Sequence, residues 1–403
     1  MKAVMYGGGN IGRGFIGLLF SQSGYEVTFI DVVDSVVESL NQEKRYPVRF
    51  VSTNGKEDVF VEPVCAVHGN DTEQVAKTIA EADVMATAVG VRVLKFIAPN
   101  IANGIRMRKE TCGKPLNIII CENLIDADKL LASLIREQLN EEEIRWFEEN
   151  VGLVEASIGR MVPIQTDEMK EGEPLRVCVE RYGFLPVDKT AFKGEIPDIK
   201  NMVPHTPFGF YIERKLYVHN MGHSLCAYLG DYLGKKYIYQ SIDDSDVQYI
   251  VENAMLESAR AIAKQYGEDL RGILLHVQDL MMRFTNEVLG DTCARVGGDP
   301  ARKLGGKDRL IGASGLCLEQ GIYPAYILLG AAGGVYQYLK ENEKEQGIHE
   351  ALEVLKEVSG LEETDERTKG ILGFYEMYWK GASVKEMKLK AQAMEAERLG
   401  DIV

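Results

Sequence analysis

The stretch Lys2-Ala-Val-Met-Tyr-Gly-Gly-Gly-Asn-Ile-Gly-Arg-Gly14, close to the N-terminus, decides the fold. An apolar run of strand length ends where the glycines begin, and the residues after them have apolar side chains at helical spacing. The glycines satisfy the pattern Gly-x-Gly-x-x-Gly. Between a strand and a helix, this pattern permits a tight turn, close approach of a diphosphate, and close packing of the helix on the strand. The sequence therefore predicts a dinucleotide-binding turn made by Gly7, Gly8, Gly9, Asn10, Ile11 and Gly12.

Asp31 bears on which dinucleotide this turn binds. It ends the second predicted strand, 19 residues beyond Gly12. A carboxylate at this place accepts hydrogen bonds from a ribose 2′-hydroxyl and repels a 2′-phosphate. Val32 and Val33 follow, so no adjacent arginine offers to bind that phosphate. The sequence favours NAD over NADP; the alternative is that Asp31 only caps a surface helix.

The first third of the chain alternates segments of strand and helix character. Apolar runs of strand length cover residues 2–6, 26–30, 85–89 and 117–121. Helical patterns cover residues 12–20, 72–82, 93–107 and 124–139. This alternation implies right-handed crossovers and a mostly parallel sheet. Within residues 48–64, two further strand-like stretches flank Asn54-Gly55, which is a strong hairpin signal, and we expect an antiparallel insertion at the sheet edge.

The second half of the chain has a different character. A strand-rich stretch, residues 152–185, is followed by three prolines within eleven residues, which favour extended backbone over helix. The helical patterns after them cover residues 212–232, 244–266, 270–285, 322–339 and 348–358. The predicted class is therefore α/β, with an N-terminal doubly wound sheet of Rossmann type, an antiparallel extension and a mainly α-helical C-terminal domain. We place the domains at 1–195 and 196–403.

The composition narrows the class of protein. The chain has 403 residues, of which 45% are hydrophobic and 27% charged, as in soluble globular enzymes. No apolar run reaches the roughly 18 residues of a membrane span, and the glycine-rich N-terminus does not resemble a signal peptide. The net charge of −15 argues against nucleic acid and anionic membranes as partners. The seven scattered cysteines favour reduced thiols in the cytoplasm. No obvious exposed apolar helix requires a partner, so a monomer is expected.

A second constellation lies in the segment Lys215-Leu-Tyr-Val-His-Asn-Met-Gly-His223. On an ideal α-helix, Lys215, His219, Asn220 and His223 fall within an arc of about 140°. A single lysine in such a helix is normally a surface residue, and a single histidine is normally a core residue. Four polar groups on one side of the helix favour a functional site instead. With NAD, a lysine of lowered pKa can act as a base, an asparagine can donate to a developing alkoxide, and a histidine can fix a neighbouring hydroxyl.

A metal site is the alternative for this segment. His219 and His223 have the i, i+4 spacing of a metal-binding pair. However, position 220 is Asn, so the His-Glu-x-x-His pattern fails, and no cysteine pattern nearby supplies zinc ligands. A metal-free acid/base site is therefore the preferred interpretation.

Asn123 is a second candidate donor to the reacting oxygen. It follows the predicted strand 117–121, at the carboxyl end where open α/β sheets bind ligands. Its position also suits the N-cap of the helix predicted over 124–139, and both roles are compatible.

These residues together resemble the polyol-specific long-chain dehydrogenases, the mannitol dehydrogenase family. The resemblance rests on Lys215-x4-Asn220-x2-His223 in a helical domain that follows a Gly-x-Gly-x-x-Gly domain. The supporting segments run in the family order over about three-quarters of the chain: residues 8–17, 121–127, 160–163, 215–223, 299–304 and 308–313. The chain length fits the phosphate-specific branch of the family.

The resemblance implies metal-independent interconversion of D-mannitol 1-phosphate and D-fructose 6-phosphate with NAD. Lys215 would be the general acid/base, Asn123 and Asn220 would polarise the reacting oxygen, and His223 would position the substrate. The alternatives are a related dehydrogenase of mannitol, fructuronate or tagaturonate, or a sensor that binds NAD without catalysis.

The substrate phosphate needs a basic pocket in this acidic chain. Several arginine and lysine residues lie close in sequence to Asp299-Pro300. The planar guanidinium of arginine can donate two parallel hydrogen bonds to phosphate oxygens. The alternative is that these side chains only balance Asp299 and Asp308. Gly298 departs from the resemblance, which leads us to expect a charged residue before Asp-Pro. The candidates are Arg295, Arg302, Lys303, Lys307 and Arg309, with Arg160 as a further one.

Overall fold

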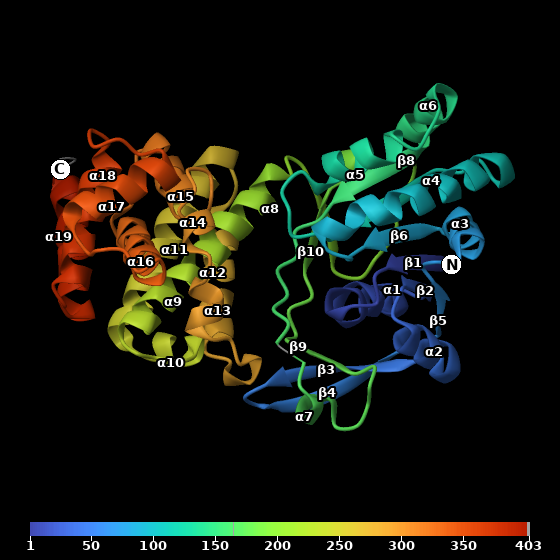
Figure 1. The fold of residues 1–403 in the computed structure, drawn as a ribbon, viewed down its shortest axis with the longest axis horizontal. Coiled ribbons are helices and arrows are strands. Elements are labelled where there is room, and N and C mark those ends of the chain that lie inside the picture. Colours follow the sequence, from blue (N-terminus) through green and yellow to red (C-terminus); the bar gives the residue numbers. More distant parts are fainter. Residues whose placement is uncertain (164, 401–403) are drawn as a thin grey trace. The chain divides into compact units, whose positions relative to one another are not determined.

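The computed structural model describes residues 1–163 and 165–400, and only the backbone of residues 399 and 400. The chain forms two compact units that divide between Gly209 and Phe210, and their helices and strands are labelled in Figure 1. The domain boundary expected from the sequence lies at residue 195. The segment between the two positions belongs with the first unit because β11 (Met202–His205) pairs in parallel with β10 (Leu185–Asp188).

A six-stranded sheet forms the centre of the first unit, and all its strand pairs are parallel, which confirms the predicted fold class. Its order is β5-β2-β1-β6-β7-β8. The chain moves outward from β1 in both directions, so the strand order reverses beside β1, and open sheets bind ligands at the carboxyl ends of the strands at such a point. The strands are β1 (Lys2–Tyr6), β2 (Glu26–Asp31), β5 (Val64–His68), β6 (Val84–Thr87), β7 (Leu116–Ile120) and β8 (Val151–Glu155).

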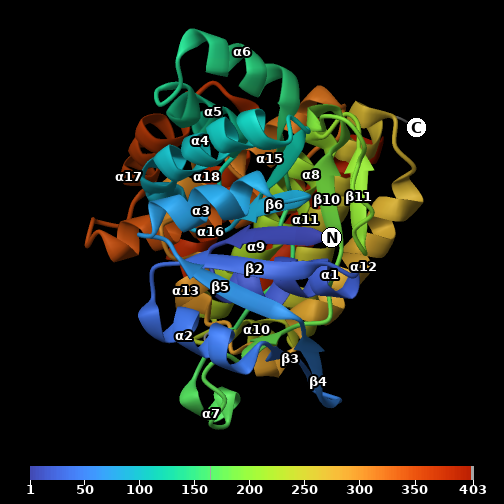
Figure 2. The same cartoon turned by 90° about the vertical axis from the view of Figure 1, so that its right-hand side faces the viewer.

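Helices cover both faces of this sheet (Figure 2). Ala3 and Met5 of β1 face one core, which contains residues of the first two helical segments and α2, and Val4 and Tyr6 face the other. This alternation follows from the two-residue period of a strand and makes the sheet doubly wound. The helical segments of this unit are η1 (Gly12–Ile16), α1 (Gly17–Gln22), α2 (Asp34–Glu43), α3 (Thr72–Ala80), η2 (Val91–Val93), α4 (Leu94–Thr111), α5 (Ala127–Arg136), α6 (Glu141–Asn150), α7 (Asp167–Lys170) and η3 (Lys189–Ala191).

The predicted hairpin is confirmed, but its expected place at the edge of the parallel sheet is wrong. The strands β3 (Tyr46–Ser52) and β4 (Gly55–Val61) pair in antiparallel fashion, and β3 pairs with β9 (Val177–Val179) in a separate three-stranded sheet. The small sheet packs on η1. A Cβ on Gly14 would lie 2.7 Å from Cγ1 of Val177, so only glycine permits this approach.

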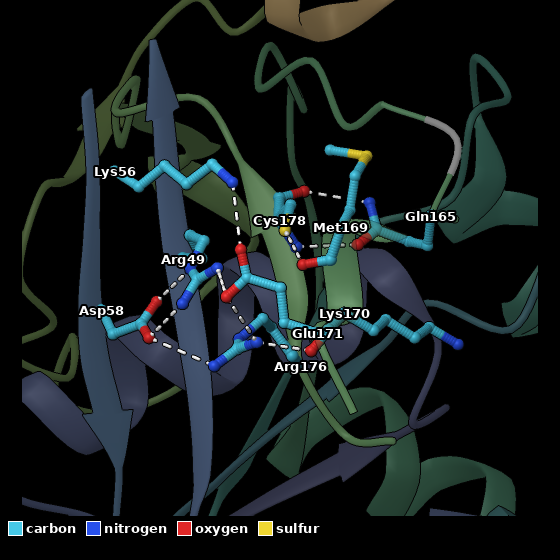
Figure 3. A network of polar contacts seen from close by, with 9 residues as sticks. All are labelled: Arg49, Lys56, Asp58, Gln165, Met169, Lys170, Glu171, Arg176 and Cys178. Atoms are coloured by element: carbon cyan, nitrogen blue, oxygen red, sulfur yellow. Dashed lines mark hydrogen bonds and ion pairs between the residues drawn. The ribbon is translucent and has the colours of Figure 1, made fainter. Parts of the chain in front are cut away.

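Charged side chains fasten the hairpin to the segment that precedes β9 (Figure 3). Arg49 on β3 forms ion pairs of 2.6 Å with Asp58 and with Glu171, and Arg176 contacts the same two carboxylates at 3.3 and 3.5 Å. Both arginines are largely buried, so solvent screens these ion pairs less than it screens surface pairs. The network therefore stabilises the small sheet over η1.

The free edge of β9 is paired by a side chain instead of a strand (Figure 3). The Cys178 backbone N–H donates to Oε1 of Gln165 at 2.7 Å, and Nε2 of Gln165 donates back to the Cys178 carbonyl at 3.0 Å. The Gln165 amide thus occupies the edge groups of β9 that would otherwise be open to another chain.

The second unit is helical, as predicted. α16 is its central helix, because residues 325–335 are buried on all sides. Among the described residues, no helix is long and apolar enough to cross a membrane. The helical segments are α8 (Gly209–Glu213), η4 (Arg214–Asn220), α9 (Met221–Tyr232), α10 (Ile238–Ile242), α11 (Ser245–Tyr266), α12 (Leu270–Phe284), η5 (Glu287–Leu289), α13 (Cys293–Gly297), α14 (Pro300–Lys303), α15 (Ile311–Glu319), α16 (Ala325–Glu341), α17 (Ile348–Val354), η6 (Leu355–Ser359), α18 (Glu366–Trp379) and α19 (Val384–Gly400).

Candidate active site

The glycine turn joins β1 to η1, and its glycines are required for different reasons. Gly7 has a φ of +104°, which favours glycine, and its N–H donates to the Ile30 carbonyl at 2.8 Å. A Cβ on Gly12 would lie 1.9 Å from the Gly7 carbonyl oxygen. A Cβ on Gly9 would meet no atom within 4 Å, so the fold itself does not require glycine there. The open space at Gly9 is where a diphosphate would approach the backbone, and the turn therefore fits a dinucleotide.

Asp31 lies directly against this turn. Its Oδ2 accepts the Gly8 N–H at 2.6 Å, and its Oδ1 accepts the Val33 N–H at 2.9 Å. The N-cap of α2 is Val33 and no side chain caps it, so the alternative interpretation of Asp31 as a helix cap is wrong. Val32 and Val33 are exposed beside the carboxylate. This end of β2 offers a carboxylate for a ribose and an apolar surface for a base.

Arg13 supports the turn from below, and the sequence analysis missed this role. Its guanidinium is buried and donates from Nε to the Gly8 carbonyl at 2.6 Å and from Nη1 to the Leu175 carbonyl at 2.5 Å. Burial lowers the pKa of Arg13. An arginine between glycines at the start of an otherwise apolar helix was the only sequence signal for it.

Arg160, a candidate for phosphate binding, also supports η1. It is buried, donates from Nη1 to the Gly14 carbonyl at 2.7 Å and stacks on Phe15 with its guanidinium carbon 4.5 Å from the ring centroid. A second donor, Nε, contacts the Tyr182 carbonyl. These contacts assign Arg160 to the packing of the first unit.

Asn123 is exposed in the loop between β7 and α5, and it lies in the first unit with the glycine turn. The predicted N-cap role is wrong, because α5 begins at Ala127 and its N-cap is Asp126, whose left-handed backbone stops the helix from extending toward Asn123. Glu122, which the sequence analysis did not select, is buried and accepts the N–H groups of Val89 at 3.0 Å and Gly90 at 2.8 Å.

Lys215 and Asn220 lie on a π-helix, η4, where the sequence predicted continuous α-helix. The Met221 N–H donates to the Leu216 carbonyl five residues earlier. Since this pattern stacks residues five apart, Lys215 and Asn220 lie closer to one side than the predicted arc of about 140° implies. Single π-turns of this kind occur often at functional sites.

The environment of Lys215 suits acid/base chemistry. Burial lowers the pKa of Lys215 to about 8, and the nearby charge of Arg309 contributes in the same direction. A lysine with such a pKa exchanges its proton near neutral pH, which an ordinary surface lysine does not.

His223 is held as a neutral, oriented ring. It stacks on Phe284 with ring centroids 4.8 Å apart and an angle of 15°, and its Nε2 lies 3.6 Å from Oδ2 of Asp291. Burial lowers the pKa of His223 to about 3, helped by Arg295 and other cations. His219 is buried with its ring 6.1 Å from that of His223. Within residues 1–163 and 165–400, no three His, Cys, Asp or Glu side chains are arranged to hold a metal ion, and metal independence stays a prediction.

The five basic candidates near α14 differ in their surroundings. Arg295 is paired with Asp291, and Arg302 is exposed and paired with Asp299 at 2.8 Å and with Asp308 at 3.4 Å. Lys307 is exposed. The surroundings of these three residues agree with the alternative, in which the basic side chains balance nearby acids or contact solvent.

Lys303 and Arg309 are the exceptions in this cluster. Lys303 is 4% exposed. Burial, followed by the charges of Arg309 and Arg302, lowers the pKa of Lys303 to about 8. Arg309 is half-buried and donates to Oδ1 of Asp308 at 2.9 Å and to Oγ of Ser224 at 3.4 Å. Two cations that act on each other where solvent is partly excluded are typical of an anion site.

Comparison with known proteins covers both units of the chain. Residues 1–201 match the family model of the mannitol dehydrogenase Rossmann domain, and residues 209–392 match that of the mannitol dehydrogenase C-terminal domain. The chain is 35% identical over 381 residues to a mannitol-1-phosphate 5-dehydrogenase of Thermoanaerobacter pseudethanolicus, which covers 93% of this chain and 97% of the relative. It is 39% identical over 313 residues to that of Bacillus subtilis, which covers 77% and 82%.

Two solved structures share the fold at low sequence identity. A D-sorbitol dehydrogenase in substrate-free form gives a TM-score of 0.78 with 14% identity, covering 96% of this chain and 94% of that one. Pseudomonas fluorescens mannitol 2-dehydrogenase, in a ternary complex with NAD and D-mannitol, gives 0.74 with 14% identity, covering 98% and 94%. With both family models matched and relatives above one-third identity over most of the length, the chain belongs to the mannitol dehydrogenase family.

Proposed function

We propose that this protein interconverts D-mannitol 1-phosphate and D-fructose 6-phosphate with NAD. The observation that carries the proposal is Lys215, a half-buried lysine on a π-turn with Asn220, whose pKa of about 8 suits proton transfer. The relatives named mannitol-1-phosphate 5-dehydrogenase support the choice of substrate.

The first unit holds NAD in this proposal. The turn of Gly7, Gly9 and Gly12 binds the diphosphate, and Asp31 accepts the ribose hydroxyls and disfavours the 2′-phosphate of NADP. NAD bound there would supply the hydride acceptor for oxidation of the substrate alcohol carbon, and NADH the hydride for the reverse reaction.

The second unit supplies the acid/base groups. Lys215 removes the hydroxyl proton during oxidation and returns it during reduction. Asn220 and, from the first unit, Asn123 donate hydrogen bonds to the oxygen as negative charge develops on it. His223 is neutral, so it orients a neighbouring hydroxyl through a hydrogen bond without competing for the proton.

The phosphate is assigned to Lys303 and Arg309 among the five basic candidates. Lys303 is buried, and the positive charge of Arg309 acts on it and helps to lower its pKa. A dianionic phosphate would neutralise both and offset the desolvation of the lysine.

The setting of the reaction is also a proposal. All seven cysteines are unpaired in the structure, which supports a reducing compartment such as the cytoplasm. The monomeric state stays a prediction from the sequence.

The experiment follows the absorbance of NADH on addition of D-fructose 6-phosphate to the full chain. Lys215→Met should lower kcat by about 10²–10⁴-fold while the Kd for NADH stays unchanged, since general acid/base catalysis contributes this much. Lys235→Met, an exposed lysine just beyond α9, is the matched control. Turnover of free fructose or a hexuronate alone would move the protein to another branch, and NADH binding without any oxidation would favour the sensor.

A further inference from the structure

The loop that carries Asn123 is fastened at both ends by carboxylates. At its start, Glu122 accepts two backbone N–H groups from the loop after β6, as described above. At its end, Oε1 of Glu155 accepts the Asp126 N–H at 3.0 Å. Asn123 stands between these two attachments, so neither flank of the loop can move without breaking a hydrogen bond.

Glu155 reaches this loop because of the sheet register. It is the last residue of β8, and it pairs with Ile120, the last residue of β7. The chain leaves β7 at this level and turns into α5, which packs against β8. Asp126 has a φ of +59°, a conformation that non-glycine residues adopt rarely, and its N–H points to Glu155 in that conformation.

The surroundings of Glu155 are acidic. The charged groups that act on it are Asp128 at the start of α5, Asp126 in the loop and Asp188 at the end of β10. Asp126 is paired with exposed Lys129 at 2.6 Å, and Oδ1 of Asp128 is buried without a hydrogen-bond partner in the described chain. Burial first, and then Asp128, raises the pKa of Glu155 to about 7.

We propose that Glu155 is a positioning residue for the reaction: through the Asp126 N–H it holds the loop that presents Asn123. This inference rests on the proposed role of Asn123 in polarising the reacting oxygen. The ionised carboxylate is the stronger acceptor, because hydrogen bonds to charged groups are roughly twice as strong as neutral ones. A proton on Glu155 weakens its hold on the Asp126 N–H.

The proposal predicts a loss of activity below neutral pH that does not come from Lys215. Reduction of the ketose needs protonated Lys215, whose pKa of about 8 limits this direction only on the alkaline side. An acid limb near pH 7 in the same direction therefore reports Glu155. Titration of the substrate phosphate is common to all variants and cancels when their profiles are compared.

The test compares kcat for reduction of D-fructose 6-phosphate in the full chain between pH 6 and 8. Glu155→Ala should lower kcat by about 10-fold at pH 8, as expected for losing a hydrogen bond to a charged group, with the KM for NADH unchanged. Glu155→Gln keeps an acceptor but cannot titrate, so its acid limb near pH 7 should vanish. Glu143→Ala is the matched control, because Glu143 also accepts one backbone N–H, that of Asn140 at 2.9 Å, but on α6.

A double variant distinguishes a failure of the positioning role of Glu155 from a failure of the proposed role of Asn123. If Glu155 acts through Asn123, the losses in Glu155→Ala and Asn123→Ala should not add in the double variant. Additive losses, or an acid limb that survives in Glu155→Gln, would overturn the positioning role. An unchanged kcat in Asn123→Ala would instead remove Asn123 from the proposed function.

Hydrogen exchange tests the same contact without turnover. The Asp126 amide should exchange faster in Glu155→Ala than in the wild-type chain, and faster at pH 6 than expected from its rate at pH 8 after correction for intrinsic exchange. Equal protection in the two chains would show that Glu155 does not hold the loop, whatever the substrate.

Discussion

The backbone N–H of Gly8 donates to Oδ2 of Asp31 across 2.6 Å. The residue proposed to select the cofactor is therefore also a support of the turn proposed to bind its diphosphate. A second N–H, that of Val33, donates to the other oxygen of the same carboxylate, so Asp31 has a fixed orientation before any ligand arrives. Preorganisation of this kind lowers the entropic cost of binding.

Asp31→Ala should weaken NAD binding by about 10–100-fold, because hydrogen bonds to a charged group are worth about 1.5–3 kcal/mol. The discrimination against NADP should narrow, since the repulsion of the 2′-phosphate is lost. Titration of protein fluorescence with each cofactor measures both effects. Asp34→Ala, an exposed carboxylate on α2, is the control, and unchanged discrimination in Asp31→Ala would reject the selective role.

The two glycines Gly9 and Gly12 should respond differently to alanine. In Gly12→Ala, the new Cβ meets the Gly7 carbonyl at 1.9 Å, so the chain should lose about 1–3 kcal/mol or more of stability and bind NAD poorly. Gly9→Ala has room for its Cβ and should unfold at the wild-type denaturant concentration, yet bind NAD more weakly. Urea unfolding with and without NAD distinguishes the two, and a destabilised Gly9→Ala would contradict the geometry.

Lys303→Met should raise the KM for D-fructose 6-phosphate by about 100-fold, because a charge-assisted contact to phosphate is lost. Any turnover of free fructose, which carries no phosphate, should not change with this substitution. Stability should not fall, since the variant removes a charge that burial disfavours. Lys307→Met, an exposed neighbour, serves as the control, and a larger effect there would reassign the phosphate site.

Lys215→Met should be more stable than the wild type at neutral pH. The folded-state pKa of Lys215, about 8, lies below the unfolded value, so folding is penalised wherever the lysine must be charged. The penalty is complete below pH 8 and disappears as the pH rises toward the ordinary lysine pKa of about 10.4. Urea unfolding from pH 7 to 10 measures the difference, which should shrink with pH; a constant difference would show that Lys215 is not desolvated.

Arg13→Lys should weaken NAD binding almost as much as Arg13→Met. A single ammonium cannot bridge the Gly8 and Leu175 carbonyls, whose contacts with the guanidinium are 2.6 and 2.5 Å long. The expected cost is about 1–3 kcal/mol of stability from the buried carbonyls left unpaired, together with a raised Kd for NAD. Calorimetry of NAD binding and urea unfolding measure these quantities, and full rescue by lysine would mean that charge alone matters.

Local sequence was sufficient for the dinucleotide turn. Its glycines, the preceding strand and Asp31 lie within the first 31 residues, and two of the constraints that choose glycine there are local: the φ of +104° at Gly7 and the close approach of Gly12 to the Gly7 carbonyl. The hairpin was predictable for the same reason, because Asn54-Gly55 fixes a two-residue turn. The identity of Lys215, Asn220 and His223 as one group also follows from their spacing on a single helix.

Tertiary structure decided the parts whose partners are distant in the chain. Arg13 reaches a carbonyl 162 residues away, the hairpin joins β9 instead of the parallel sheet, and Glu155 holds a loop that begins 34 residues earlier. The π-turn at η4 and the burial of Lys303 depend on the residues that pack around them. The sequence by itself determined which reactive side chains are available, because their availability depends on residue type and local spacing. Desolvation and long-range contacts, which set the pKa of Lys215 and separate Lys303 from its basic neighbours, exist only once the chain has folded.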